Sequence, residues 1–213
     1  MNVLVVYSHP NPESFTHAIL ESFVNGLQDG GHTSEVVDLY KINFNPNFNI
    51  EDFDTFVGGS APPDVLEQQR KVAAADAFAF ICPVFWMNMP ANMIGWIVRV
   101  FSYGFAYQLT KKGWQGHASG RVGLLQQRKA LVMSPTFFSE KDYRESGILD
   151  AMKKIICEYG FEYPGVAKAD YVFFYRAFAV SDAIRDKYLR QAYALGKDFD
   201  DEGGRDANST KAA

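Results

Sequence analysis

The chain has 213 residues, of which 47% are hydrophobic and 22% charged, and its formal net charge is −4. This length suits one α/β domain, and the mild negative charge gives no electrostatic support for binding nucleic acid, which needs a basic face. The two cysteines belong to no CxxC or Cys/His cluster, so we expect neither a metal site nor a redox dithiol.

Apolar runs and helical patterns alternate along the chain. The spacing predicts strands at Asn2–Ser8, Ser34–Tyr40, Ala77–Pro83, Lys129–Ser134 and Val172–Ala177. Helices are predicted from residue 15 to the glycine pair at 30 and 31, over 63–76, 91–102 and 145–159, and after a capping Ser181. In the helix over 145–159, we expect the apolar stripe to consist of Ile148, Ala151, Ile155 and Ile156. The long segments 41–63 and 103–123 are predicted to be irregular, a length that is uncommon in a loop unless it binds or docks something.

Strands that are apolar on both faces and alternate with helices predict an α/β fold, a doubly wound five-stranded parallel sheet in the flavodoxin-like order 2-1-3-4-5. We expect a single domain over residues 1–200 and a frayed tail over 201–213. Ligands of such sheets bind beyond the carboxyl ends of the strands. This rule brings His9–Thr16, Pro83–Met87 and Ser134–Phe137 to one edge of the sheet.

The loop after the first predicted strand has the composition of an anion site. A helix N-terminus carries unpaired N–H groups and a partial positive charge, which favour phosphate. His9, Ser14 and Thr16 add imidazole and hydroxyl groups. Because no glycine occurs before Gly26, this is neither a Gly-rich Rossmann loop nor a P-loop. The alternative is an ordinary turn in which Ser14 only caps the helix.

The segment from Pro83 to Ala91 is the second candidate site. An apolar strand that runs into Phe85, Trp86 and Met87 at the ligand edge offers rings for a flat heterocycle and backbone groups for its polar edge. The alternative is that Trp86 packs inside the protein against Trp96.

Taken in order, several motifs make the chain resemble the NAD(P)H:quinone oxidoreductases of the flavodoxin-like superfamily. The resemblance covers about the first two thirds of the chain. Its motifs are Ser8-His9-Pro10, Ser14-Phe15, Asp38-Leu39-Tyr40, Asn43-Phe44-Asn45-Pro46, Pro83-x-x-Trp86-x-x-x-Pro90-Ala91, Gly95-Trp96-x-x-Arg99-Val100-Phe101, Gly104-Phe105-Ala106-Tyr107 and Lys129-Ala130-Leu131.

The resemblance implies a single flavin-binding domain that holds FAD, with FMN as the alternative, and that uses NAD(P)H as co-substrate. It implies a homodimer with the site at the interface, and a ping-pong hydride transfer to a quinone or a similar flat acceptor. The implied cofactor-binding residues are His9, Ser14, Phe15, Thr16, Pro83, Val84, Phe85, Trp86, Met87, Ser134, Thr136 and Phe137. The implied substrate residues are Trp86, Met87 and, from across the dimer, Tyr107.

One segment departs from the family. Relatives commonly have Thr-Thr-Gly-Gly after the fourth strand, where this chain has Ser134-Pro135-Thr136-Phe137. Pro135 lacks an N–H, and Phe137 adds bulk where glycine would allow close approach. No histidine follows His117, so we expect Tyr143, or water, to act where well-studied relatives use a Tyr and a His.

Other roles stay open at this point. They are an azo- or nitro-aromatic reductase, an ancillary subunit that docks on a membrane transporter through Tyr103–Trp114, and a one-electron carrier. We expect a cytoplasmic protein, because the sequence shows neither a signal-peptide pattern nor an apolar run of membrane-span length. Carboxylates at Glu13, Asp38, Asp142 and Asp150 are expected at the surface or in caps, and Cys82 in the core.

Overall fold

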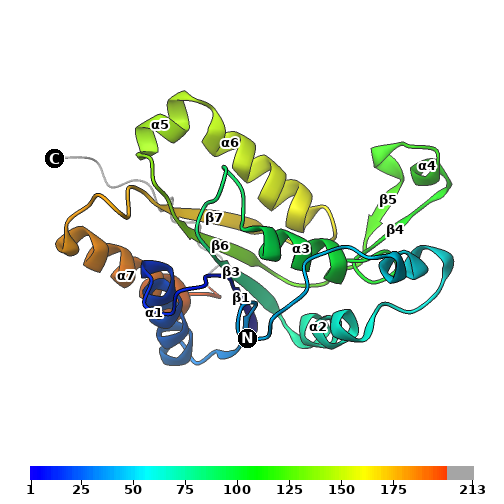
Figure 1. Ribbon diagram of the computed structural model, residues 1–213, viewed down its shortest axis with the longest axis horizontal. Coiled ribbons are helices and arrows are strands. Elements are labelled where there is room, and N and C mark those ends of the chain that lie inside the picture. The colour runs from blue at the N-terminus through cyan, green and yellow to red at the C-terminus, as the bar shows by residue number, and fades with distance from the viewer. Residues whose placement is uncertain (201–213) are drawn as a thin grey trace.

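The computed structural model describes residues 1–200 and contains one large parallel sheet (Figure 1). The sheet has five strands in the order β2-β1-β3-β6-β7, and each neighbouring pair is parallel. The strands are β1 (Asn2–Tyr7), β2 (Thr33–Asp38), β3 (Ala77–Ile81), β6 (Ala130–Pro135) and β7 (Ala169–Phe174). Without the two strands of a separate hairpin, this is the predicted order 2-1-3-4-5, so the fold prediction is confirmed.

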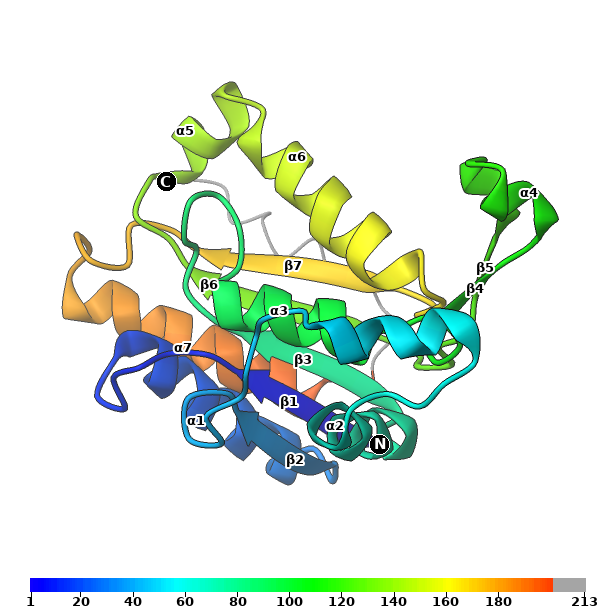
Figure 2. The ribbon, with the colours of Figure 1, turned by 45° about the vertical axis from the view of Figure 1, so that its right-hand side comes forward.

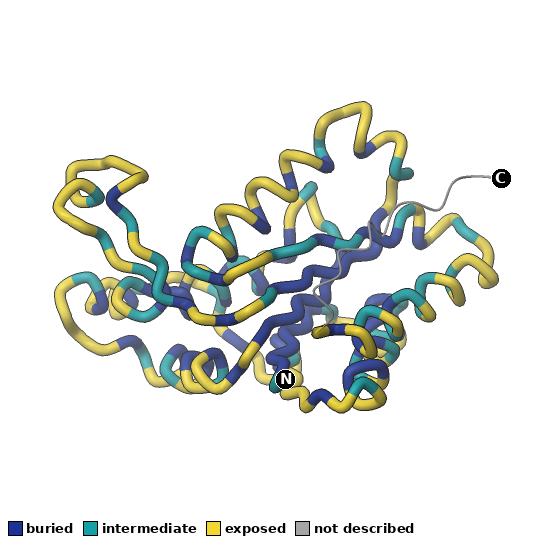
Figure 3. Tube along the Cα trace, turned by 180° about the vertical axis from the view of Figure 1, so that it is seen from behind, coloured by how far each residue is buried: buried dark blue, intermediate teal, exposed yellow. Residues whose placement is uncertain are grey.

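Helices cover both faces of the sheet because successive strand residues point to opposite sides. Val3 and Val5 of β1 pack on one side with α1 (Phe15–Asp29) and α7 (Asp182–Lys197), while Leu4 and Val6 pack on the other. That second side is covered by α2 (Pro63–Ala74), α3 (Ala91–Val100), α6 (Ile148–Lys153) and the π-helical η3 (Lys154–Glu162), as Figure 2 also shows. Figure 3 shows the central strands buried and the outer loops exposed.

The predicted helix over 145–159 is wrong in its bounds and in most of its buried stripe, of which only Ile156 is buried as predicted. A short helix α5 (Glu140–Glu145) ends before Gly147, whose φ of +73° breaks the winding, and α6 and η3 follow. The buried residues are Leu149, Met152, Ile156 and Cys157, whereas Ile148 is only half-buried, and Ala151 and Ile155 are exposed. The new helix start and the wider π winding rotate the inward face away from the expected one.

Both segments predicted to be irregular contain regular structure. The first holds the 3₁₀ helix η1 (Ile50–Val57). The second folds into an antiparallel hairpin of β4 (Tyr107–Leu109) and β5 (Arg121–Gly123), which carries α4 (Lys111–Trp114) and η2 (Ala118–Gly120). We call residues 103–123 the hairpin arm. It projects from the end of the sheet where β7 begins (Figures 1 and 2).

Both ends of β7 differ from the prediction. β7 begins at Ala169 and ends at Phe174, three residues earlier than expected at each end, because pairing with β6 starts at Ala130 and Ala169.

Ser181 stands at the N-cap of α7 as predicted, but its hydroxyl makes no capping hydrogen bond. The predicted tail at 201–213 lies outside the described residues. Within residues 1–200, no helix combines the length and the apolarity that a membrane crossing needs.

A buried ion network ties the long segment after β2 to α3. The Arg99 side chain is almost fully buried, and its Nε lies 3.1 Å from each carboxylate oxygen of Asp52 on η1. Its Nη1 donates to the Asn45 carbonyl at 2.8 Å and to Asp64 of α2 at 2.5 Å. One guanidinium therefore fixes three segments that are distant in the sequence.

Candidate functional site

Backbone hydrogen bonds join the carboxyl ends of four strands at one edge of the sheet. The N–H of Ser8, after β1, donates to the Ile81 carbonyl of β3 at 3.0 Å. The N–H of Val84 donates to Pro135 at 3.3 Å, and that of Thr136 to Phe174 at 2.9 Å. The three segments that the sequence rule assigned to one edge therefore lie there together.

The N-terminus of α1 leaves N–H groups free at this edge. Ser14 caps the helix, since its Oγ accepts from the N–H of His17 at 3.1 Å. Within residues 1–200, the N–H groups of Phe15 and Thr16 have no partner. The His9 ring accepts from the N–H of Asn11 at 3.1 Å and remains half-buried. Ser14 therefore caps the helix, while the N–H groups of Phe15 and Thr16 remain available to bind an anion.

The turn after β3 is strained and presents an exposed ring. Phe85 and Asn88 exchange two backbone hydrogen bonds of 2.9 Å, and the residues between them have positive φ angles, +49° at Trp86 and +57° at Met87. This is the geometry of a type I′ turn, which Asn and Gly usually occupy. The Trp86 side chain is 99% exposed, so the alternative that it packs against the buried Trp96 is wrong. Strain of this kind persists mainly at functional sites.

Two variants that both remove the indole, and differ only in the β-carbon, measure this strain. We expect Trp86→Gly to be more stable than Trp86→Ala by about 0.5–1 kcal/mol. A β-carbon at positive φ costs about 1–2 kcal/mol, which exceeds the roughly 0.5–1 kcal/mol entropic penalty of glycine. Denaturant unfolding of both variants measures the difference. An alanine variant as stable as the glycine variant would show that the turn is relaxed.

The loop after β6 leaves the edge open despite its bulky residues. Phe137 is 70% exposed and contacts Phe138 and Phe178, so its ring is not buried at the strand ends. In the described part of the chain, the N–H groups of Trp86, Met87 and Phe137 have no hydrogen-bond partner. Free donors around an exposed aromatic ring fit a flat heterocycle with polar edge atoms. The residues present therefore fit a flavin.

Some predicted cofactor residues face the interior. The Ser134 hydroxyl lies 3.0 Å from the buried Tyr171 hydroxyl. The Thr136 hydroxyl donates to the Phe138 carbonyl at 3.0 Å, and the Thr16 side chain is buried. Pro83 is buried as well, while Val84 is half-buried and Phe85 is exposed. At these positions the backbone, more than the side chain, is available to a ligand.

The carboxylates and Cys82 lie as expected. Glu13 and Asp150 are exposed, and Asp38 accepts from the N–H groups of the two residues that follow Leu39. Asp142 forms a capping box with Ser139. Cys82 is fully buried, and burial raises the pKa of its thiol to about 12. None of these groups supplies a base or a nucleophile at the edge.

A family model described as "Flavodoxin-like fold" matches residues 1–195. Ribosyldihydronicotinamide dehydrogenase (quinone) of Rattus norvegicus is 31% identical over 163 residues, which are 68% of this chain and 68% of that protein. The chain belongs to the flavodoxin-like NAD(P)H:quinone oxidoreductase family.

Two further similarities concern relatives of this family. Ribosyldihydronicotinamide dehydrogenase-like protein traD of Penicillium crustosum is 31% identical over 175 residues, 73% of this chain. The match spans 65% of that relative, a little under two thirds of its length. The solved NAD(P)H:quinone oxidoreductase from Methanothermobacter marburgensis has a TM-score of 0.83 and 29% identity, over 96% of this chain and 99% of that one.

For an NAD(P)H:quinone oxidoreductase, the position of Tyr143 is informative. Its side chain is 1% exposed, and its ring lies 6.4 Å from Phe138 and 5.7 Å from Phe173 between centroids. Burial raises the pKa of Tyr143, and a hydrogen bond with the Thr136 side chain lowers it in part. The hydroxyl therefore stays protonated at neutral pH, next to Thr136 of the segment that follows β6.

Tyr107 is not brought to the other residues of the family site within one chain. It lies on β4 of the hairpin arm. Leu125, two residues after the arm, donates its N–H at 2.9 Å to the carbonyl of Pro164, in the turn between η3 and β7. Figures 1 and 2 show the arm at the opposite end of the sheet from the strand arrowheads. Trp86 and Tyr107 can meet only if Tyr107 comes from a second subunit.

Two further aromatic residues, Phe138 and Phe178, lie at this edge and were not predicted from the sequence. Phe178 is 68% exposed in the loop after β7, and its ring centroid lies 6.4 Å from that of Phe137. The Phe-Phe pair after β6 was a usable signal. Phe178 had none, because it meets Phe137 only through the pairing of β6 with β7.

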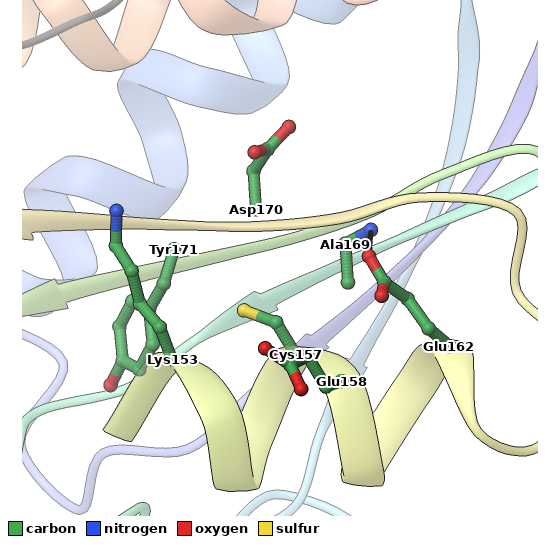
Figure 4. Close-up of a pocket in the computed structure, with 7 residues that line it drawn as sticks. All are labelled: Lys153, Cys157, Glu158, Glu162, Ala169, Asp170 and Tyr171. Atoms are coloured by element: carbon green, nitrogen blue, oxygen red, sulfur yellow. Dashed lines mark hydrogen bonds between the residues drawn. The ribbon is translucent and has the colours of Figure 1, made fainter. Parts of the chain in front are cut away.

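A cavity of about 240 Å³ lies away from this edge, between η3 and β7 (Figure 4). Its carboxylates are already paired: Glu158 with Lys154, Asp170 with Lys168, and Glu162 with the N–H of Ala169. Burial raises the pKa of the Cys157 thiol in its wall to about 12, so the thiol stays protonated at neutral pH. This cavity is not a candidate active site.

Proposed function

We propose that the protein is a flavin-dependent NAD(P)H:quinone oxidoreductase. The chain is an oxidoreductase of the flavin-dependent reductase class by its family. The observation that carries the finer proposal is the set of free N–H groups at Trp86, Met87 and Phe137 around a fully exposed indole, beside the free N-terminus of α1. A ring system with a phosphate-bearing tail matches both features.

The edge divides into a ring site and a phosphate site. We assign the ring to the segment from Pro83 to Met87 and to the loop after β6. We assign the phosphate groups to His9, Ser14 and the first turn of α1, where the helix dipole favours negative charge. FAD is the expected cofactor, and FMN, which lacks the second phosphate and the adenosine, is the alternative.

The bound flavin would supply the hydride chemistry, and the protein supplies orientation and electrostatics. Trp86 and Met87 form a wall on which a flat donor and a flat acceptor can stack in turn, so the exchange is ping-pong. His9 is assigned to the phosphate groups and Cys82 is buried in the core, so we assign no protein nucleophile to the reaction. Tyr143 is the residue assigned to donate a hydrogen bond to charge that develops there.

A homodimer completes the site in this proposal. An apolar surface runs along η1 and the hairpin arm, and its exposed members are Phe48, Ile50, Phe53, Val57, Trp114 and Val122. Ring contacts connect it, including 5.3 Å between the centroids of Phe56 and Tyr103. Such a surface is typical of a subunit interface. In the proposed dimer, Tyr107 of one copy would approach the edge of the other. We place the dimer in the cytoplasm, in keeping with its two free cysteines.

Release of the chromophore tests the proposal directly. We expect purified protein to be yellow, and heat-released cofactor to have the mass of FAD. Initial rates with NADH or NADPH and a benzoquinone should give parallel double-reciprocal lines, as a ping-pong exchange requires. Colourless protein that takes up neither FAD nor FMN would refute the proposal. Intersecting lines would refute the ping-pong exchange alone.

A further inference from the structure

An exposed aromatic surface borders the proposed site on the side of β6 and β7. Phe137 and Phe178 are 70% and 68% exposed, and their centroids lie 6.4 Å apart. Phe138 lies edge-on to Phe137, with 5.5 Å between centroids, and is 45% exposed. We call these three rings the phenylalanine cluster. They leave contiguous apolar area in water beside the place assigned to the flavin ring.

The phenylalanine cluster is held by backbone hydrogen bonds. The N–H of Ala177 donates to Thr136 at 3.0 Å, and the N–H of Arg176 donates to Phe138 at 3.2 Å. These bonds fasten the loop that carries Phe178 to the loop that carries the other two rings. The surface is therefore built before any ligand arrives, and a ligand need not order it.

The same cluster is continuous with the Trp86 wall. Trp86 follows Val84 by two residues, and Phe137 follows Pro135 by two, while the N–H of Val84 donates to the carbonyl of Pro135 at 3.3 Å. A flat acceptor stacked on the wall therefore has the phenylalanine cluster next to it. The loop from Ser134 to Phe138 contains no charged residue, and the nearest charged side chain in the facing loop is the exposed Arg176, two residues before Phe178.

We propose that the phenylalanine cluster binds the hydrocarbon tail of an alkyl-substituted quinone, which makes lipophilic quinones the preferred acceptors. This inference rests on the proposed function. The reaction itself is unchanged: NAD(P)H and a proton reduce the quinone by two electrons and two protons to the quinol, and the tail takes no part. The tail contributes binding through apolar area removed from water.

Two quinones with one ring test the inference. 2,3-Dimethoxy-5-methyl-1,4-benzoquinone has no tail, and its 6-decyl derivative carries one. With the flavin-loaded protein, we expect kcat/KM to be about tenfold higher for the decyl compound. A tenfold difference is about 1.4 kcal/mol, which corresponds to burying roughly two methylene groups.

Variants then locate the tail. Phe178→Ala should lower kcat/KM for the decyl quinone by about fivefold, because the exposed ring supplies much of the apolar contact. It should change kcat/KM for the tailless quinone by less than about twofold, since Phe178 does not belong to the assigned ring site. Phe178→Leu keeps a branched hydrocarbon and should restore most of the loss. Ile155→Ala removes a comparably exposed apolar side chain on η3 and should change neither rate.

The outcomes separate this inference from the function beneath it. No turnover with either quinone would refute the proposed function. Equal kcat/KM for both quinones in the unmodified protein, or equal losses for both in Phe178→Ala, would overturn the tail site and leave the function standing. Sedimentation velocity supplies a further check. A Phe178→Ala protein that changes from dimer to monomer would assign the cluster to a subunit interface and overturn the inference.

Discussion

Arg99→Ala is expected to lower the free energy of unfolding by about 3–5 kcal/mol. In the native protein, both carboxylate oxygens of Asp52 lie 3.1 Å from the Arg99 Nε. The substitution leaves this buried carboxylate without its counter-charge. It also frees Asp64 and the Asn45 carbonyl, so η1 and α2 lose their common anchor on α3. Since domains are stable by only about 5–15 kcal/mol, this is a large fraction of the total. Equilibrium unfolding in urea measures the loss.

An exposed arginine gives the matched control. Arg144 pairs with Glu140 at 2.6 Å one helical turn away, but both side chains are open to solvent. Arg144→Ala should therefore cost no more than about 0.5 kcal/mol. The double variant Arg99→Ala with Asp52→Ala should be more stable than the sum of the two single losses predicts, because it removes the unpaired charge. Equal losses at Arg99 and Arg144 would refute a structural role for the buried network.

Trp86→Ala is expected to lower kcat/KM for the quinone by about tenfold, or about 1.4 kcal/mol, and to leave stability unchanged within about 0.5 kcal/mol. The indole touches almost nothing in the free protein, so its removal costs little in folding. Its stacking area is used only when a flat ligand is present. Steady-state rates and unfolding curves of the same preparation check both parts.

The buried tryptophan provides the contrast. Trp96 is fully buried, and its Nε1 donates to Gln68 at 3.2 Å. Trp96→Ala should cost about 3–5 kcal/mol of stability through lost packing. A similar loss in Trp86→Ala would mean that the turn packs inside the folded protein. Unchanged turnover in Trp86→Ala would remove the indole from the acceptor wall.

The central strands could be predicted because each is apolar on both faces. That pattern is required of a strand such as β1 or β3, which lies inside a parallel sheet with helices on both sides. The bounds of β7 could not be predicted in this way, since Asp170 pairs with Leu131 through its backbone whatever its side chain. The same holds for the hairpin arm, where β4 and β5 are too short to show a period and exist through their mutual pairing.

The candidate site divides in the same manner. The loops after β1, β3 and β6 could be assigned to one edge, because parallel strands place all their carboxyl ends together. The outward position of Trp86 could not be predicted, since it depends on positive φ angles that local preference disfavours. The distance between Tyr107 and the edge follows from where the arm attaches to the sheet, which no local pattern records.

By itself, the sequence determined the doubly wound sheet, its strand order and the edge where the loops after β1, β3 and β6 meet, because hydrophobic periodicity marks each strand and parallel strands place their carboxyl ends together. Only the tertiary structure decided which side chains at that edge face water. The exposure of Trp86 depends on a turn with positive φ angles, which local preference disfavours. The meeting of Phe137 with Phe178 depends on backbone hydrogen bonds between β6 and β7, which lie far apart in the chain. Contacts of that kind leave no periodic trace in the order of the residues.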